Sequence, residues 1–182
     1  MALPYRLLPD EDLSETQMYV TTQAYDAHAK EYAEAWEWNP VTIKETKKYN
    51  IVPFLPHVPA GGSLLVAENQ SGRDYQLFLS EGFRVLGISR SFGLLQEALR
   101  RVPNGLFLHL DIRSLPFMPQ SFDAIYADAM VHIPKKDLRS MLKDFRIFLR
   151  PGGALYLSLL LGDGNVIAVD DTGGKRYMTV YT

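Results

Sequence analysis

The sequence predicts an α/β fold built around a mostly parallel β-sheet. Between residues 61 and 160, short apolar runs alternate with amphipathic segments, which is the pattern of consecutive β-α-β units. The chain has 182 residues, of which 47% are hydrophobic, and this length and composition suit a single domain with its own core. Right-handed crossovers between parallel strands favour the spatial strand order 3-2-1-4-5, with strands numbered along the chain.

Five apolar runs are expected to form the strands of this sheet. In chain order they are residues 63–67, 83–88, 106–110, 122–127 and 154–160. The intervening segments have apolar residues at helical spacing and are predicted as helices over residues 72–81, 92–102 and 136–149. Gly82 suits the end of the first helix, and Pro151-Gly152-Gly153 is expected to end the last one and turn the chain.

The two ends of the chain are predicted to frame this core. Residues 1–60 read as an arm followed by helices over 16–38 and 41–55, separated at Asn39-Pro40 and capping a cleft in the core of residues 61–182. Residues 166–169 and 176–181 are expected to form a β-hairpin whose turn is Asp171-Thr172-Gly173-Gly174. The whole chain is therefore expected to be one domain.

Composition excludes several classes of function. The chain has no cysteine, so disulfide frameworks, cysteine zinc sites, iron–sulfur clusters and thiol nucleophiles are excluded. The formal net charge of −2 gives no electrostatic reason to expect nucleic acid or an anionic membrane as a partner. The four histidines lack metal-ligand spacing, and no metal is expected. No apolar run approaches the roughly 18–20 residues of a membrane span, and a cytoplasmic location is the default expectation.

Several motifs taken together resemble the class I S-adenosylmethionine-dependent methyltransferases, in their small-molecule branch. The motifs are Tyr25–Tyr32, Gly72-Arg73-Asp74, Leu115-Pro116-Phe117, Ser121-Phe122-Asp123, His132-Ile133-Pro134 and Leu149–Gly153. They are similar to the family's opening helix, the end of its glycine-rich loop, the surroundings of its fourth strand and the turn before its fifth. The resemblance runs from about residue 24 to residue 182 and implies a Rossmann-like fold with S-adenosylmethionine as the cofactor.

The cofactor loop departs from the family pattern, which is an acidic residue followed by Gly-x-Gly-x-Gly. Counting back from Gly72, the acidic position holds Val66, and the first two glycine positions hold Glu68 and Gln70. Glycine adopts backbone angles closed to other residues and lets the main chain approach a ligand. A glutamate adds bulk and negative charge where the cofactor's own carboxylate lies, so the resemblance implies repulsion together with steric exclusion.

A second departure lies at the end of the second strand, where the family's acidic residue binds both ribose hydroxyls. Ser89 holds that position, and a serine hydroxyl makes one neutral hydrogen bond instead of two charge-assisted ones of about 1.5–3 kcal/mol each. Asp111 still matches the position often near the adenine. We therefore expect S-adenosylmethionine binding to be weak or absent. The expected cofactor-cleft positions are Val66, Glu68, Gln70, Gly72, Ser89 and Asp111.

Two residues after the fourth strand are the catalytic candidates. His132 lies where this family often places a histidine near the substrate, and its role would be general base or orienter. Asp128 lies at the exit of the same strand. The structural alternatives are a packed loop histidine and a solvated turn carboxylate. Gly87-Ile88-Ser89 is similar to a nucleophile elbow, but its second glycine is missing, which disfavours a hydrolase.

The intact scaffold motifs and the altered cleft favour a methyltransferase-like pseudoenzyme that is catalytically weak or inactive and acts as a subunit or regulator. The alternatives are an active S-adenosylmethionine-dependent methyltransferase with a divergent loop, and a lyase or cyclase reaction in the same cleft. Family domains continue past strand five with further strands, which this sequence does not supply before Thr182. Its apolar fifth strand is thus expected at a sheet edge and to pair with a second chain, either a copy or an active relative.

Overall fold

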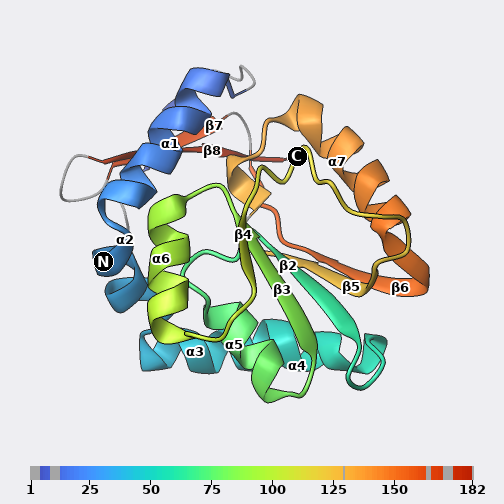
Figure 1. The fold of residues 1–182 in the computed structure, drawn as a ribbon. Coiled ribbons are helices and arrows are strands. Elements are labelled where there is room, and N and C mark those ends of the chain that lie inside the picture. The colour runs from blue at the N-terminus through green and yellow to red at the C-terminus, as the bar shows by residue number, and fades with distance from the viewer. Residues whose placement is uncertain (1–4, 9–12, 129, 163–164, 170–173, 182) are drawn as a thin grey trace.

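The computed structural model describes residues 5–8, 13–128, 130–162, 165–169 and 174–181. Its five-stranded parallel sheet has the order β4-β3-β2-β5-β6 (Figure 1), which is 3-2-1-4-5 in the numbering of the core strands, as predicted. The strands are β2 (Ser63–Ala67), β3 (Arg84–Ser89), β4 (Phe107–His109), β5 (Phe122–Ala127) and β6 (Leu149–Leu157).

Helices cover both faces of this sheet. The helices between its strands are α5 (Arg73–Ser80), α6 (Phe92–Arg101) and α7 (Lys135–Phe148), and a 3-10 turn, η4 (Met130–His132), precedes α7. The N-terminal segment forms α1 (Glu15–Ala27), α2 (Ala29–Tyr32), η1 (Ala33–Glu37), α3 (Pro40–Thr46), η2 (Lys47–Ile51), α4 (Val52–Phe54) and η3 (Leu55–His57). The predicted break at Asn39-Pro40 is the start of α3, because the Asn39 side chain accepts a hydrogen bond from the Val41 N–H at 2.9 Å.

The central strand β2 shows why apolar and polar residues do not alternate in these runs. Leu64 and Val66 pack with η2, α4 and α5 on one face, while Leu65 and Ala67 pack with α7 on the other. All four side chains are buried. A parallel strand covered on both faces needs apolar residues at every position, and this need is what made the strands visible in the sequence.

The fifth strand differs from the prediction at both ends. β6 begins at Leu149 and ends at Leu157, so the residues expected to form a turn, Pro151-Gly152-Gly153, lie within it. Leu149 pairs with Phe122 and Ala154 with Ala124, and the pairing is irregular between these two points. The Arg150–Asp123 ion pair, at 2.7 Å, holds the irregular segment beside β5.

A second, antiparallel sheet joins the two ends of the chain. It has the order β1-β7-β8, formed by β1 (Tyr5–Leu8), β7 (Asn165–Val169) and β8 (Lys175–Thr179), and it lies next to α1 (Figure 1). The predicted hairpin is confirmed as β7 and β8. Residues 171–173 of its expected turn lie outside the described residues. The N-terminal strand was not predicted, because four residues are too few to show a period.

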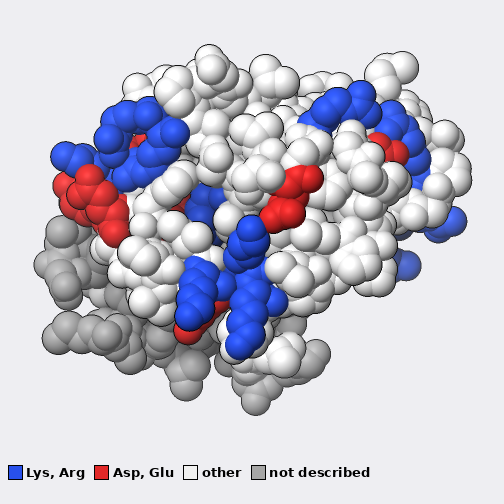
Figure 2. Space-filling model, turned by 90° about the horizontal axis from the view of Figure 1, so that it is seen from below, with Lys and Arg blue, Asp and Glu red and all other residues white. Residues whose placement is uncertain are grey.

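Strand β6 is the outer strand of the large sheet. Beyond its end, Gly162 N donates to Tyr181 O at 2.9 Å, and Tyr181 N donates to Leu160 O at 2.8 Å. The tail thus covers the segment just after β6. Of the helices described, none has the length and apolar character needed to cross a membrane. Figure 2 shows Lys and Arg side chains in separate groups with acidic side chains beside them, so the described part of that face has no continuous basic surface.

The junction of β2, β5 and β6 rests on Asp123. Its Oδ2 accepts hydrogen bonds from Ser63 N at 2.7 Å, Ser63 Oγ at 3.0 Å and Arg150 Nη1 at 2.7 Å. We predict that Asp123→Ala lowers the free energy of unfolding by about 1 kcal/mol, because the partly buried Ser63 donors and the exposed Arg150 lose their common acceptor. Urea denaturation measures this change, with Asp144→Ala on α7 as the matched control. Equal effects of the two substitutions would contradict the prediction.

Candidate functional site

The loop after β2 keeps a left-handed backbone at every second residue. The φ angles are +55° at Glu68, +52° at Gln70 and +91° at Gly72, although only the last is glycine. A left-handed conformation costs a residue with a side chain about 1–2 kcal/mol. The loop therefore has the backbone that glycines would give it, but it needs contacts elsewhere to offset the strain.

Those contacts come from the N-terminal segment. Tyr32 Oη donates to Gln70 Oε1 at 2.7 Å. Glu37 Oε2 accepts from Ser71 N at 2.6 Å and also from Ser71 Oγ. Trp38 Nε1 donates to Ser71 O at 3.1 Å. We call this set of contacts from residues 32–38 to residues 70–71 the loop clamp.

The clamp includes a buried carboxyl group. Burial raises the pKa of Glu37 to about 7, against the opposing attraction of Arg73. Arg73 is paired with Asp74, with Nε 2.7 Å from Oδ1, and its Nη2 lies 3.6 Å from Asp128 Oδ2. Asp128, one of the two catalytic candidates, is thereby part of an ion-pair group beneath the loop.

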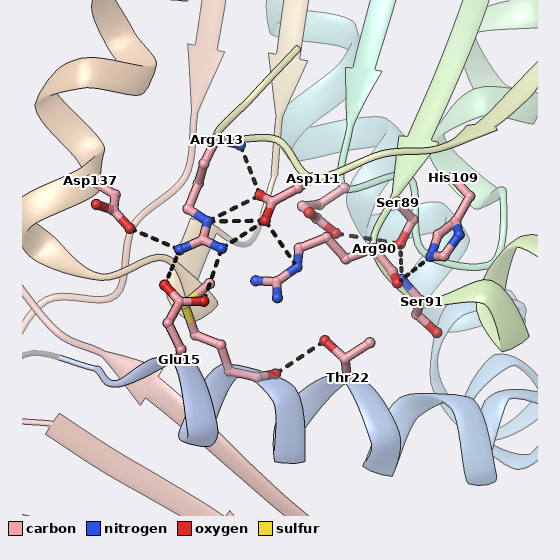
Figure 3. Close-up of polar contacts among 11 residues, drawn as sticks. Glu15, Thr22, Ser89, Arg90, Ser91, His109, Asp111, Arg113 and Asp137 are labelled. Carbon is pink, nitrogen blue, oxygen red and sulfur yellow. Dashed lines mark hydrogen bonds and ion pairs between the residues drawn. The ribbon is translucent and has the colours of Figure 1, made fainter.

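Glu68 reaches from the loop to the end of β3. Ser89 Oγ lies 3.4 Å from Glu68 Oε2, and it accepts a hydrogen bond from Ser91 N at 3.2 Å (Figure 3). Glu68 Oε1 is buried without a hydrogen-bond partner among the described residues. Burial raises the pKa of this carboxyl to about 7, although Arg90 acts to lower it. A carboxyl group thus lies beside Ser89, the position where the resemblance led us to expect an acidic residue.

Helix α1 lies directly over the start of α6. Asp26 Oδ1 accepts from Ser91 Oγ at 2.5 Å and from Gly93 N at 2.9 Å. A Cβ added at Gly93 would lie 2.8 Å from Asp26 Cα, so only glycine allows this approach. The carboxylate also faces the positive end of the α6 dipole, which favours its charge.

Asp111 belongs to an ion-pair network at the carboxyl ends of β3 and β4. Its Oδ2 lies 2.7 Å from Arg113 Nη2 and 3.6 Å from Arg90 Nε, and Arg113 also binds Glu15 and Asp137 (Figure 3). Burial acts to raise the pKa of Asp111, but hydrogen bonds from Arg113 hold it below its usual value. The position expected near an adenine is therefore occupied by a salt-bridged carboxylate.

The second catalytic candidate, His132, uses both ring nitrogens within the protein. Nδ1 lies 2.7 Å from Tyr177 O, and Nε2 lies 3.0 Å from Tyr25 Oη. Burial lowers the pKa of His132 to about 4, so the ring is neutral at pH 7. Since a carbonyl oxygen can only accept, Nδ1 carries the proton and Nε2 accepts from Tyr25. Arg176 of β8 lies over the Tyr25 ring at 5.5 Å.

A narrow cavity of about 50 Å³, which we call the cleft cavity, remains between α1 and the ends of β2 and β3. It is lined by Met18, Thr21, Thr22, Tyr25, Glu68, Gln70, Ser89, Arg90, Ser91, Leu94, His132 and Ile133. The structure thus brings together four of the sequence-predicted site residues, namely Glu68, Gln70, Ser89 and His132.

The other four predicted positions do not line the cleft cavity. Val66 is buried in the core on the α5 face, and Gly72 packs against α6, where an added Cβ would meet Ala98 Cβ at 3.1 Å. Asp111 and Asp128 are held in ion pairs. Among the described residues there is no cluster of His, Asp or Glu that could hold a metal ion.

Sequence reasoning missed most of the N-terminal contacts. Tyr25 and Tyr32 are seven residues apart, a spacing that places both on one helix face, and this signal was available. Glu37 and Ser71 are 34 residues apart, and the sequence around either residue gives no sign that the two side chains are in contact. Likewise, the sequence gives no sign that Asp26 contacts the start of α6.

Comparisons with known proteins bear on this arrangement. Residues 70–153 match a family model described as "Methyltransferase domain". The chain is 29% identical to the demethylmenaquinone methyltransferase of Renibacterium salmoninarum over 123 residues, covering 65% of this chain and 50% of the relative. It is also 29% identical over 85 residues to the malonyl-[acyl-carrier protein] O-methyltransferase of Hamiltonella defensa, covering 47% of this chain and 33% of that relative. The chain thus spans half or less of the length of these relatives.

Solved structures share the fold. The PH0226 protein of Pyrococcus horikoshii superimposes with a TM-score of 0.69 at 19% identity, covering 84% of each chain. The DhpI–SAH complex gives a TM-score of 0.70 at 19% identity, covering 93% of this chain and 82% of that one. The chain thus contains a segment similar to a methyltransferase domain and has the fold of these solved structures. Its loop after β2 carries Glu68 and Gln70 on a left-handed backbone.

Replacing Glu37 by glutamine should reveal the cost of the buried carboxyl group in the loop clamp. The folded-state pKa of about 7 lies above the unfolded value of 4.5, so the folded state retains a proton that the unfolded state loses, and stability falls as the pH rises from 4.5 to 7. Glu37→Gln keeps an acceptor for Ser71 N–H and has no proton to lose. We predict that it stabilises the protein by about 2 kcal/mol more at pH 8 than at pH 5.

Urea denaturation at the two pH values measures this difference. The matched control is Glu31→Gln, which removes an exposed carboxyl group from α2 of the same segment. A pH-independent effect of Glu37→Gln, or the same difference in the control, would show that Glu37 ionises as easily in the folded as in the unfolded chain.

Proposed function

We propose that this chain is a methyltransferase homologue that is catalytically weak or inactive and acts as a subunit or regulator. The observation that carries the proposal is the loop clamp, in which side chains of the protein itself occupy the loop where the family binds its cofactor. Ser71 N–H, a donor that a ligand could use, is bonded to Glu37 at 2.6 Å. The polar end of Gln70 is likewise taken by Tyr32.

The residues present do not fit S-adenosylmethionine. The cleft cavity has a volume of about 50 Å³, whereas sites for ligands of drug size span about 300–1,000 Å³. Glu68 and Gln70 fill space that glycines would leave open, and Ser89 and Asp111 are engaged with Glu68 and Arg113. Binding would require α1 and the loop clamp to move, and the free energy of that movement would be subtracted from the affinity.

The catalytic candidates support the same proposal. His132 is neutral, partly buried and bonded through both nitrogens, so it has no free lone pair with which to remove a substrate proton. Asp128 lies 3.6 Å from the buried guanidinium of Arg73. Both residues hold the cleft walls together, which suits a scaffold better than a reaction centre.

One observation favours the second candidate function, an active methyltransferase with a divergent loop. The backbone of residues 68–72 retains left-handed angles without the glycines, at a cost of about 1–2 kcal/mol for each of Glu68 and Gln70. A cleft with no ligand would have little use for such a conformation. The curated relatives are named as methyltransferases, and DhpI was solved with SAH, so this cofactor is the appropriate probe.

Isothermal titration calorimetry with S-adenosylmethionine and S-adenosylhomocysteine separates the two functions. For the wild-type protein we predict dissociation constants weaker than about 100 μM, which corresponds to roughly 5.5 kcal/mol of binding free energy. Low-micromolar binding would overturn the proposal in favour of the active enzyme.

A triple variant, Glu68→Gly with Gln70→Gly and Ser89→Asp, restores the family residues. It should bind S-adenosylhomocysteine at least about tenfold more tightly than the wild type, a gain of about 1.4 kcal/mol. The control is Glu31→Gln, which leaves the loop unchanged. If the triple variant folds but shows no gain in affinity, these three side chains do not prevent cofactor binding, and the remaining contacts of the loop clamp do.

A supporting subunit needs a contact surface, and we propose that strand β6 provides it by pairing with a second chain. Leu155 is 39% exposed and Ile147 of α7 is 51% exposed, and together with Leu142 and Leu149 they line a groove of about 530 Å³ between α7 and β6. An apolar outer strand tends to pair with another edge.

Light scattering coupled to size exclusion tests this surface. We predict a dimer for the isolated chain and dissociation to a monomer in Leu155→Lys, because a charge in the groove opposes burial. The matched control is Leu99→Lys on α6, where the leucine is 45% exposed. A wild-type monomer at every concentration would refute the self-pairing.

A further inference from the structure

The cleft cavity contains a buried carboxylate oxygen that lacks a partner. Glu68 Oε1 is inaccessible to solvent and accepts no hydrogen bond from any described residue, while Oε2 faces Ser89 Oγ at 3.4 Å. An acceptor left unpaired in a buried site is unfavourable, and more so when it is charged. Because Glu68 also lines the cavity, a bound group that donates a hydrogen bond would remove this cost.

The hydroxyl groups on the wall have already used their protons. Tyr25 Oη donates to His132 Nε2 at 3.0 Å, and Thr22 Oγ1 donates to Met18 O at 3.1 Å. Both oxygens therefore have lone pairs, one of which on Tyr25 accepts from Arg176. Together with Glu68 Oε1 they give the cavity three acceptors beside the Gln70 amide and Arg90 donors, and these acceptors favour a ligand that supplies donors.

The charged groups near the cavity also favour a ligand that donates hydrogen bonds. The cationic group on the wall is Arg90, whose Nε lies 3.6 Å from Asp111 Oδ2. Figure 3 shows the Arg90 guanidinium on the Asp111 side, away from Ser89 and Ser91. Asp26 lies behind Ser91, with its Oδ1 2.5 Å from Ser91 Oγ. With Arg90 directed to Asp111, the Glu68 carboxylate is the charged group on the wall that a ligand can pair with, which favours a cation over an anion as the occupant.

Size and polarity limit the remainder of the ligand. Met18, Leu94 and Ile133 give the cavity an apolar side, and a volume of about 50 Å³ admits only a compact molecule. An ammonium group supplies three N–H donors, no acceptor and a positive charge, whereas an alcohol supplies one donor and no charge.

We propose that the cleft cavity binds a small protonated primary amine, whose ammonium group donates to Glu68 and to the lone pairs of Tyr25 and Thr22 and whose short alkyl part packs on Met18, Leu94 and Ile133. This ligand is chemically distinct from a nucleoside cofactor. The inference rests on the geometry of the cavity and holds whether or not the chain transfers methyl groups.

The probe pair is n-propylamine and 1-propanol, which have the same number of heavy atoms and differ in charge and donor count. Titration of ¹⁵N-labelled protein, followed by backbone amide shifts, should show the amine binding at least about tenfold more tightly than the alcohol. The shifts should fall in residues 68–72 and 89–91. Equal affinities, or shifts confined to other regions, would overturn the proposal without the need for any variant.

Amine binding should also tighten from pH 6 to pH 8. Glu68 has a pKa of about 7, so it becomes a carboxylate in this range. Other charged groups facing the site are Arg90, Asp111, Asp26, Glu37 and Arg176, and of these Glu37 also has a pKa of about 7. His132, with a pKa of about 4, is neutral throughout.

Two variants assign the pH dependence. Glu68→Gln should lose at least about tenfold in amine affinity, a change of about 1.4 kcal/mol, and should bind equally at both pH values. Glu37→Gln is the matched control, since it removes a second buried carboxyl group of similar pKa that does not line the cavity, and it should keep the pH dependence. If Glu37→Gln abolished the pH dependence of amine binding and Glu68→Gln kept it, Glu68 would not be the binding group and the proposed site would be wrong.

Discussion

The left-handed loop between β2 and α5 depends on contacts made by the N-terminal segment, and the rest of the cleft depends on that loop. Glu68 and Gln70 hold positive φ angles that cost about 1–2 kcal/mol each, and the bonds from Tyr32 to Gln70 and from Glu37 to Ser71 offset this strain. With the loop fixed, the carboxyl group of Glu68 can reach Ser89. The segment that makes the bonds is placed in turn by α1, which is anchored where Asp26 binds the start of α6.

The C-terminal hairpin extends this dependence to the other end of the chain. Tyr177 of β8 donates its N–H to Thr21 of α1 at 3.0 Å and accepts from His132 of η4 at 2.7 Å. One main-chain residue thus ties the helix above the cleft to the turn after β5, while Arg176 lies over Tyr25 and Tyr32. The sheet that contains β1 and β8 is therefore joined by hydrogen bonds to two elements that line the cleft cavity.

The sequence could predict the fold better than the site, for a physical reason. A strand buried on both faces needs an uninterrupted apolar run, as in Leu64–Ala67, and such runs are visible without knowledge of their neighbours. Strand β6 was misjudged because Pro151-Gly152-Gly153 suggests a turn, whereas the Asp123–Arg150 pair keeps it beside β5. Many cleft contacts join residues far apart in the sequence, such as Glu37 with Ser71, 34 positions apart, and Tyr25 with His132, 107 positions apart, and hydrogen bonds of this kind produce no periodic pattern in the sequence.

Glu68 and Ser89, two of the expected cofactor-cleft positions, are in contact in the structure. In the sequence, Glu68 and Ser89 are two separate departures from the family pattern. In the structure, the Glu68 carboxyl group lies 3.4 Å from the Ser89 hydroxyl, so an aspartate at position 89 would bring two carboxylates into contact in a buried site. Like charges at that separation cannot both ionise at neutral pH without a large penalty. Serine at position 89 is thus compatible with glutamate at position 68, whereas aspartate is not. The two residues together place one carboxyl group on the loop instead of at the end of the strand, so the two departures are not independent.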